Sequence, residues 1–65
     1  MSEDTLKGKW RQLTGRVRQQ WGDLTDDDIE RIGGSTDRLV GAIQERYGKT
    51  KEAARKEVET FQAGL

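Results

Sequence analysis

Apolar residues recur at every third or fourth position through the first third of the chain. These residues are Leu6, Trp10, Leu13, Val17 and Trp21. Residues with this spacing lie on one face of an α-helix, so the pattern predicts a single amphipathic helix over residues 6–21. Gly22 follows directly, and a glycine after the last apolar residue commonly ends a helix.

A second, shorter helix is predicted after this glycine. Thr25 suits the N-cap position, because its hydroxyl group can accept a hydrogen bond from the first turn. Aspartates at positions 26–28 would fill that turn, where the positive end of the helix dipole stabilises carboxylates. Ile29 and Ile32 supply the apolar face, and the Gly33-Gly34 pair would end the helix.

Two further helices are predicted in the second half of the chain. Ser35 or Thr36 can cap a third helix that ends at Gly48, and Thr50 can cap a fourth. Their apolar stripes are Leu39, Val40, Ile43 and Tyr47, and then Ala54, Val58, Phe61 and Leu65. The chain contains no proline and no strand-like alternation, so we predict an all-α fold of four short helices.

The two halves of the chain are similar when they are offset by 26 positions. The matched pairs are Leu13 with Leu39, Gly15 with Gly41, Val17 with Ile43, Trp21 with Tyr47, Gly22 with Gly48, and Ile32 with Val58. This approximate internal duplication predicts two α-hairpins, each too short to bury its own stripe and therefore packed on the other. The predicted shared core is Trp10, Leu13, Trp21, Leu39, Ile43, Tyr47, Val58 and Phe61.

Gly15 and Gly41 would occupy equivalent places inside two of the helices. A glycine in a helix interior costs about 1 kcal/mol relative to alanine. Its repetition predicts that another helix approaches closely at both positions.

Size and charge narrow the class of protein. Sixty-five residues, of which 31% are hydrophobic, predict one small domain over residues 1–65 with modest stability. Cysteine is absent, which excludes disulfides and suits a reducing cytoplasm. The N-terminus lacks an apolar targeting segment, and no run approaches the roughly 20 apolar residues of a membrane span. We therefore expect a soluble cytoplasmic protein.

The acidic turn of the second helix is the first candidate site. Consecutive helical residues point in different directions, so three adjacent aspartates do not converge on one ion, and no metal site is predicted. The simplest interpretation is the first turn of a helix. An alternative is an acidic docking patch for a basic partner, formed by Asp26, Asp27, Asp28 and Glu30.

The corresponding turn in the second half is basic and is the second candidate site. The N–H groups at the start of the fourth helix could bind an anion such as phosphate. The residues of this possible site are Lys49, Thr50, Lys51, Arg55 and Lys56. A nucleotide-hydrolysing P-loop is excluded, because that motif needs a glycine where Ile43 stands.

Other chemistry has little support in the residues. Histidine and cysteine are both absent, so we predict no enzyme, no catalytic residue, no cofactor and no small-molecule substrate. The first helix carries many cations, but its tryptophans belong to the core stripe, and the cations could pair with the acidic helix. Twelve basic residues balance 12 acidic ones, so the broad positive field that favours DNA is missing. We therefore favour an unknown protein partner over nucleic acid.

Three segments carry a resemblance to a known family. They are WRQLTGRVRQQWGDLTDDD, DRLVGAIQERYG and KEAARKEV. These segments resemble the CsbD-like family of small bacterial stress-response proteins over nearly the whole chain. The resemblance implies a cytoplasmic protein induced under general stress, a fold of two packed α-hairpins, and no catalytic residues to carry over. Within that class we expect a protein-interaction or protective role, and a nucleic-acid-binding accessory is the alternative.

Overall fold

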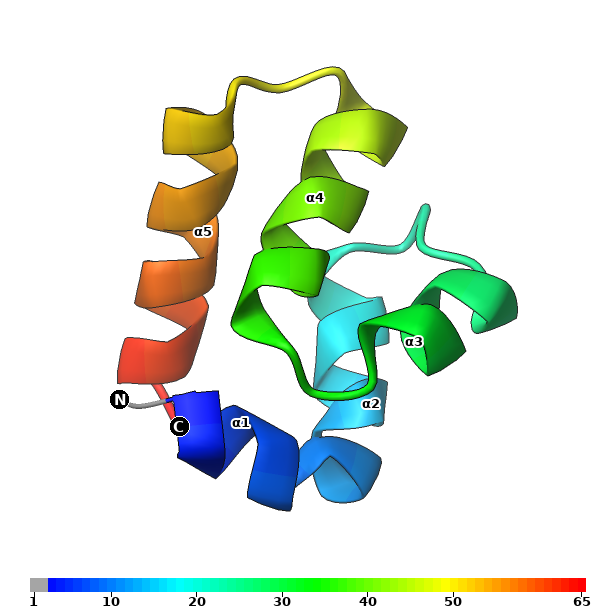
Figure 1. Cartoon of the computed structure of the whole chain (residues 1–65), viewed down its shortest axis with the longest axis vertical. Helices are drawn as coiled ribbons and strands as arrows, with labels where there is room; N and C mark the ends of the chain where they lie inside the picture. Colours follow the sequence, from blue (N-terminus) through cyan, green and yellow to red (C-terminus); the bar gives the residue numbers. More distant parts are fainter. Residues whose placement is uncertain (1–2) are drawn as a thin grey trace.

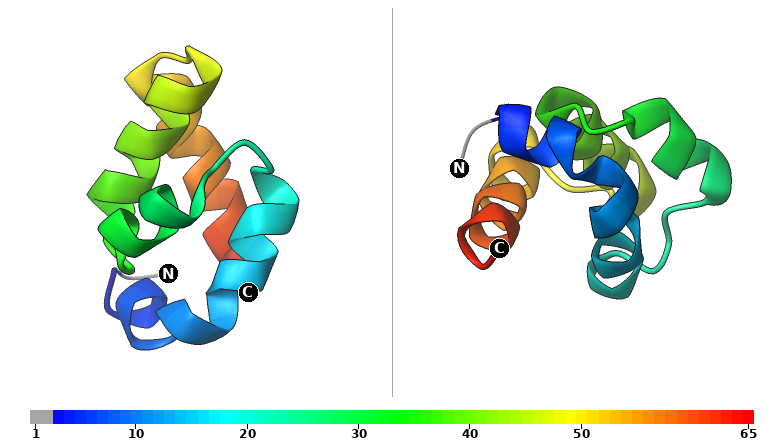
Figure 2. Two further views of the ribbon diagram at one scale, coloured as in Figure 1. Left: turned by 90° about the vertical axis from the view of Figure 1, so that its right-hand side faces the viewer. Right: turned by 90° about the horizontal axis from the view of Figure 1, so that it is seen from below.

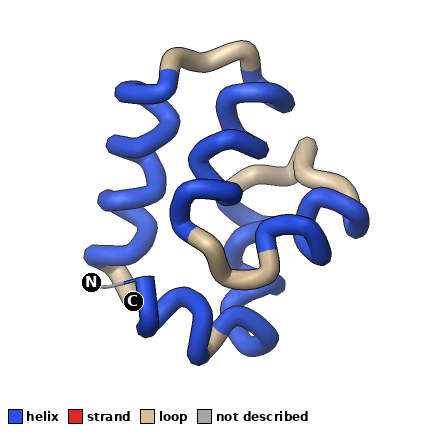
Figure 3. Tube along the Cα trace, in the orientation of Figure 1, coloured by secondary structure: helices blue, strands red, loops and turns tan. Residues whose placement is uncertain are grey.

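The protein is built from helices alone in the part that the structure describes. The computed structural model describes the backbone of residues 3–65 and the side chains of residues 6–65. It contains the helices α1 (Glu3–Gly8), α2 (Trp10–Gln20), α3 (Asp26–Ile32), α4 (Thr36–Tyr47) and α5 (Lys51–Ala63). Figure 3 shows helices joined by short loops and no strand over these residues. The predicted all-α fold is confirmed.

The helices pack around one core. α4 and α5 run antiparallel and side by side, and α3 packs against α4 (Figure 1). α1 lies beneath the lower ends of α4 and α5 in this view, and Figure 2 shows α2 on the far side of α3 and α4. The arrangement as two duplicated hairpins stays a prediction.

The first predicted helix is divided in two, which corrects the prediction of one helix over residues 6–21. α1 ends at Gly8, α2 begins at Trp10, and the Lys9 between them has φ −112° and ψ 13°. Glycine at position 8 favours the break, because it has a low helix propensity. Leu6 nevertheless keeps its place in the predicted stripe and is fully buried.

The predicted helix caps are confirmed. The Thr25 hydroxyl accepts a hydrogen bond from the Asp28 N–H at 3.1 Å, and the Asp28 carboxylate accepts one from the Thr25 N–H at 3.0 Å. Ser35, rather than Thr36, caps α4, and Thr50 caps α5. Gly33 ends α3 and Gly48 ends α4, and both residues have the left-handed conformation.

All five helices contribute to one hydrophobic core. Its buried residues are Leu6, Leu13, Val17, Trp21, Leu24, Ile29, Ile32, Leu39, Val40, Ile43, Ala54 and Val58. Three residues of the predicted core, Trp10, Tyr47 and Phe61, are only half-buried and pack on its edge. Leu24 lies in the loop before α3, outside any helical stripe, and the sequence pattern did not predict its burial.

The predicted close approach of helices at Gly15 and Gly41 is wrong. Both glycines are exposed, and a Cβ atom added at either would meet no atom within 4 Å. Gly15→Ala and Gly41→Ala are therefore each expected to raise the free energy of unfolding by about 1 kcal/mol, through helix propensity alone. Urea titration followed by circular dichroism measures the change. A loss of stability in either variant would contradict the expectation, and Gly48→Ala, with φ +63° at the wild-type position, is a control that should lose stability.

Candidate functional site

Asp28 faces the interior of the fold. The residue is only 6% exposed, and its carboxylate accepts hydrogen bonds from Arg46 Nε at 2.7 Å and Arg46 Nη2 at 3.2 Å. The Arg46 guanidinium, aided by the Thr25 backbone N–H, lowers the pKa of Asp28 from 3.8 to about 2. Asp28 therefore joins the start of α3 to the end of α4 and is not presented to a partner.

The remaining predicted acidic residues lie on the surface. Asp26, Asp27 and Glu30 are exposed around α3. Asp26 forms an ion pair with Arg18 of α2, as expected for a basic first helix beside an acidic second one. A docking role for Asp26, Asp27, Asp28 and Glu30 stays a prediction, and Asp28 is the one buried residue of the four.

Glu57 of α5 is the centre of a polar network that the sequence did not predict. Its carboxylate accepts a hydrogen bond from Trp21 Nε1 at 3.0 Å and forms an ion pair with Lys49. These two contacts, with Lys49 the stronger, lower the pKa of Glu57 below its ordinary value. The Lys49 ammonium also lies 5.4 Å from the centre of the Tyr47 ring, where a cation is attracted to the aromatic face.

Tyr47 extends this network to the loop after α2. Its hydroxyl oxygen accepts a hydrogen bond from the Asp23 N–H at 3.0 Å. Trp21 and Tyr47 are the paired aromatic residues of the approximate repeat, and the polar atom of each has a partner. Since buried or half-buried tryptophan and tyrosine side chains need such partners, the two aromatic-glycine pairs were a signal that polar contacts would gather here.

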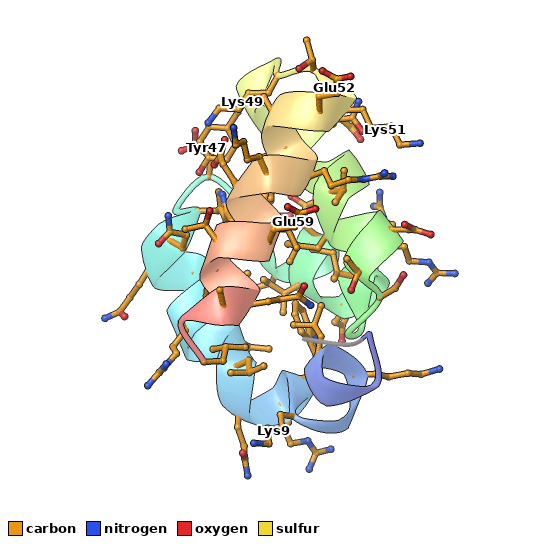
Figure 4. The ribbon with its side chains drawn as sticks, turned by 90° about the vertical axis from the view of Figure 1, so that its left-hand side faces the viewer. Lys9, Tyr47, Lys49, Lys51, Glu52 and Glu59 are labelled. Atoms are coloured by element: carbon orange, nitrogen blue, oxygen red, sulfur yellow. The ribbon has the colours of Figure 1, made fainter. Side chains whose placement is uncertain are left out.

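The predicted anion-binding residues point in different directions. In Figure 4, Lys49 and Lys51 lie on opposite sides of the start of α5, with Lys49 beside Tyr47. The Thr50 hydroxyl accepts a hydrogen bond from the Ala53 N–H and so caps the helix. Arg55 and Lys56 are exposed farther along α5. Phosphate binding at this turn stays a prediction, and Lys49 has a structural partner in Glu57.

A groove lies between α2 and α5. Its volume is about 610 Å³. Ala53, Phe61 and Leu65 contribute apolar atoms, while Arg16 of α2 and Lys56 of α5 stand on opposite sides. Figure 4 looks onto α5 with α2 beside it. The sequence did not predict this groove, because α2 and α5 meet only in the folded protein.

The described residues contain neither a cluster of metal ligands nor a helix that could span a membrane. Among the side chains that the structure describes, no three acidic groups gather closely enough to hold a metal ion. The helices over residues 3–65 are all too short or too polar to cross a membrane.

Comparison with known proteins now identifies the family. The family model described as CsbD-like matches residues 4–56. The chain belongs to the CsbD-like family. The family match includes the Thr25–Asp28 cap, Arg46 and both groove cations, whereas Phe61 and Leu65 lie after it.

Relatives of this CsbD-like chain match it over nearly its full length. A UPF0337 protein of Pseudomonas aeruginosa is 54% identical over 61 residues, which are 94% of each chain. A UPF0337 protein of Bordetella pertussis is 56% identical over 61 residues, 94% of this chain and 92% of that protein. The UPF0337 protein YjbJ of Escherichia coli K12 is 55% identical over 58 residues, 89% of this chain and 84% of that protein. None of these names states an enzymatic activity.

Proposed function

We propose that this CsbD-like protein is a non-catalytic stress-response protein of the bacterial cytoplasm that acts by binding another protein. Membership of the CsbD-like family supports the stress-response part of the proposal. The open groove between α2 and α5 is the observation that carries the binding part. Its lining combines apolar atoms with charged side chains, as surfaces that bind other proteins do.

The carboxylates with shifted pKa values support a role without catalysis. A shifted pKa in a cleft often marks a catalytic acid or base. Here Asp28 is bound by Arg46 and the Thr25 N–H, and Glu57 is bound by Lys49 and Trp21. Each carboxylate is stabilised in its charged form by partners that hold helices together, so its shift has a structural cause.

Nucleic-acid binding is the alternative function. Exposed Lys51 and Arg55 on α5, together with the basic surface of α2, favour it. The equal numbers of basic and acidic residues speak against it, and so does the ion pair between Lys49 and Glu57. A Lys51→Glu, Arg55→Glu double variant tests this alternative more cleanly than a Lys49 variant, because Lys49 is already paired with Glu57.

The proposed function predicts a survival defect in bacteria that lack the protein. We expect a deletion strain to lose viability after drying, osmotic shock or starvation, and the wild-type gene to restore it. The measurement is colony counts before and after each stress. Unchanged survival of the deletion strain in all three stresses would contradict the stress-response role.

A further inference from the structure

The chemistry of the α2–α5 groove indicates the kind of partner it can bind. We propose that the groove is a docking site for an acidic, amphipathic segment of a partner protein. Apolar side chains of that segment would enter beside Phe61 and Leu65, and its carboxylates would meet Arg16 and Lys56. The inference rests on the proposed protein-binding function and adds to it the place and the chemistry of the partner.

The charges around the groove favour an acidic ligand. Within the part of the chain that the structure describes, neither Arg16 nor Lys56 forms an ion pair, and both are exposed. Glu57 also lines the groove, but its carboxylate is engaged by Lys49 and Trp21. Because a cation of the protein already compensates Glu57, the groove presents a net positive field to a ligand.

The apolar part of the groove favours a ligand with apolar side chains. Phe61 is half-buried, and its ring packs on Trp21 with 5.1 Å between ring centroids and a tilt of 57°. Leu65 is likewise half-buried. A ligand that covers these side chains removes apolar surface from water, which stabilises the complex.

Other occupants fit these features less well. Duplex DNA offers phosphates to Arg16 and Lys56 but no apolar side chain for the groove. A second copy could offer acidic α3, but the apolar residues of that helix, Ile29 and Ile32, are buried in its own core. An acidic amphipathic segment satisfies both the cations and the apolar surface.

Titration of the isotope-labelled full chain with a synthetic peptide tests the proposal. The probe is a helical peptide with leucine at positions i, i+3, i+4 and i+7 and glutamate elsewhere. We expect shifts at the Trp21 indole N–H and at amides of α2 and α5 that border the groove. A matched peptide with lysine in place of glutamate should bind at least about tenfold more weakly, since it meets like charges. Equal binding of the two peptides would overturn the proposal.

Two double variants distinguish binding in the groove from a general effect of the protein's charge. Arg16→Glu, Lys56→Glu reverses both groove cations, and Lys9→Glu, Arg11→Glu makes the same charge change outside the groove, at the exposed start of α2. The first variant should raise the Kd of the acidic peptide at least about tenfold, and the second by less than about threefold. Dispersed amide spectra confirm that both variants are folded. Equal weakening in the two variants would overturn the site.

Titrations with other ligands test the choice of partner. Groove shifts caused by duplex DNA, by phosphatidylglycerol vesicles, or by raising the protein concentration alone would overturn the proposal if the acidic peptide causes none. Shifts confined to α3 and α4 on addition of the acidic peptide would also overturn it, because they would place binding away from the α2–α5 groove.

Complementation of the deletion strain distinguishes this inference from the proposed function. We expect the wild-type gene and the Lys9→Glu, Arg11→Glu variant to restore survival, and the Arg16→Glu, Lys56→Glu variant to fail. If both variants restore survival fully, the groove is not the working site, while the stress-response function stands. If deletion has no effect on survival, the stress-response function fails, and the peptide titration alone decides the groove.

Discussion

Gly34→Ala is expected to destabilise the protein more than any other glycine substitution. Gly34 has φ +91°, and an added Cβ atom would lie 2.6 Å from Lys7 Cα and 3.3 Å from Trp10 Cβ. Backbone strain and overpacking each cost about 1–3 kcal/mol, so we expect a loss of roughly 2–6 kcal/mol. A domain of this size has a total stability of about 3–10 kcal/mol, so this loss is a large share. Urea titration followed by tryptophan fluorescence measures it.

Gly33→Ala is the matched control for this prediction. Gly33 also has a positive φ, of +53°, but the nearest atom to an added Cβ is the Glu30 carbonyl oxygen at 3.5 Å. The control therefore introduces strain without the contact to Lys7. If Gly34→Ala lost no more stability than Gly33→Ala, the close packing of this turn on the α1–α2 junction would be contradicted.

The two adjacent glycines show which features the sequence could predict. That Gly33 ends α3 follows from local rules, because a glycine after an apolar stripe commonly adopts the left-handed conformation. The need for a glycine at position 34 could not be predicted in this way. An added Cβ atom there would meet Lys7, which is distant in the chain and lies near Gly34 only in the folded protein. Local rules likewise predicted the Thr25, Ser35 and Thr50 caps, whereas no local rule indicates which segment packs against a turn.

The candidate sites likewise combine features that the sequence predicted with contacts that it did not. The three aspartates were predicted to begin a helix, and the Thr25–Asp28 capping box confirms that interpretation. The sequence did not indicate that Asp28 alone turns inward to Arg46, 18 positions along the chain. Lys49 was predicted to help bind an anion, but its ion pair with Glu57 depends on the turn between α4 and α5. The groove needs α2 beside α5, which the hydrophobic pattern does not specify.

The repeated glycines at positions 15 and 41 led to a wrong prediction, which was that another helix packs closely against each of them. Both glycines recur at equivalent positions, yet each faces solvent with open space around its Cα atom. The repeated glycine therefore marks an equivalent position in two helices and does not indicate a packing contact. The stabilisation expected for alanine at both sites follows from that exposure.

Acid is expected to destabilise the protein chiefly through Asp28. The pKa of Asp28 is about 2 in the folded protein and has its ordinary value of 3.8 in the unfolded chain. A carboxylate with a lowered folded pKa contributes stability that is fully present above the unfolded pKa and is lost as the pH falls through the folded pKa. The free energy of unfolding should therefore fall between about pH 4 and pH 2, as the contacts with Arg46 and the Thr25 N–H are lost. Urea titrations at a series of pH values measure the fall.

Asp28→Asn isolates this contribution, and Asp27→Asn is its matched control on the exposed side of the same turn. At pH 7 we expect Asp28→Asn to be less stable than the wild type, because the neutral amide cannot pair with the Arg46 guanidinium. The difference should shrink as the pH falls toward 2, where about half of the folded wild-type molecules carry a neutral group at position 28. Glu57, whose pKa is also lowered, leaves a smaller acid dependence in the variant. Asp27→Asn should follow the wild-type curve, and an Asp28→Asn curve parallel to that of the wild type would show that the Asp28–Arg46 pair does not control acid stability.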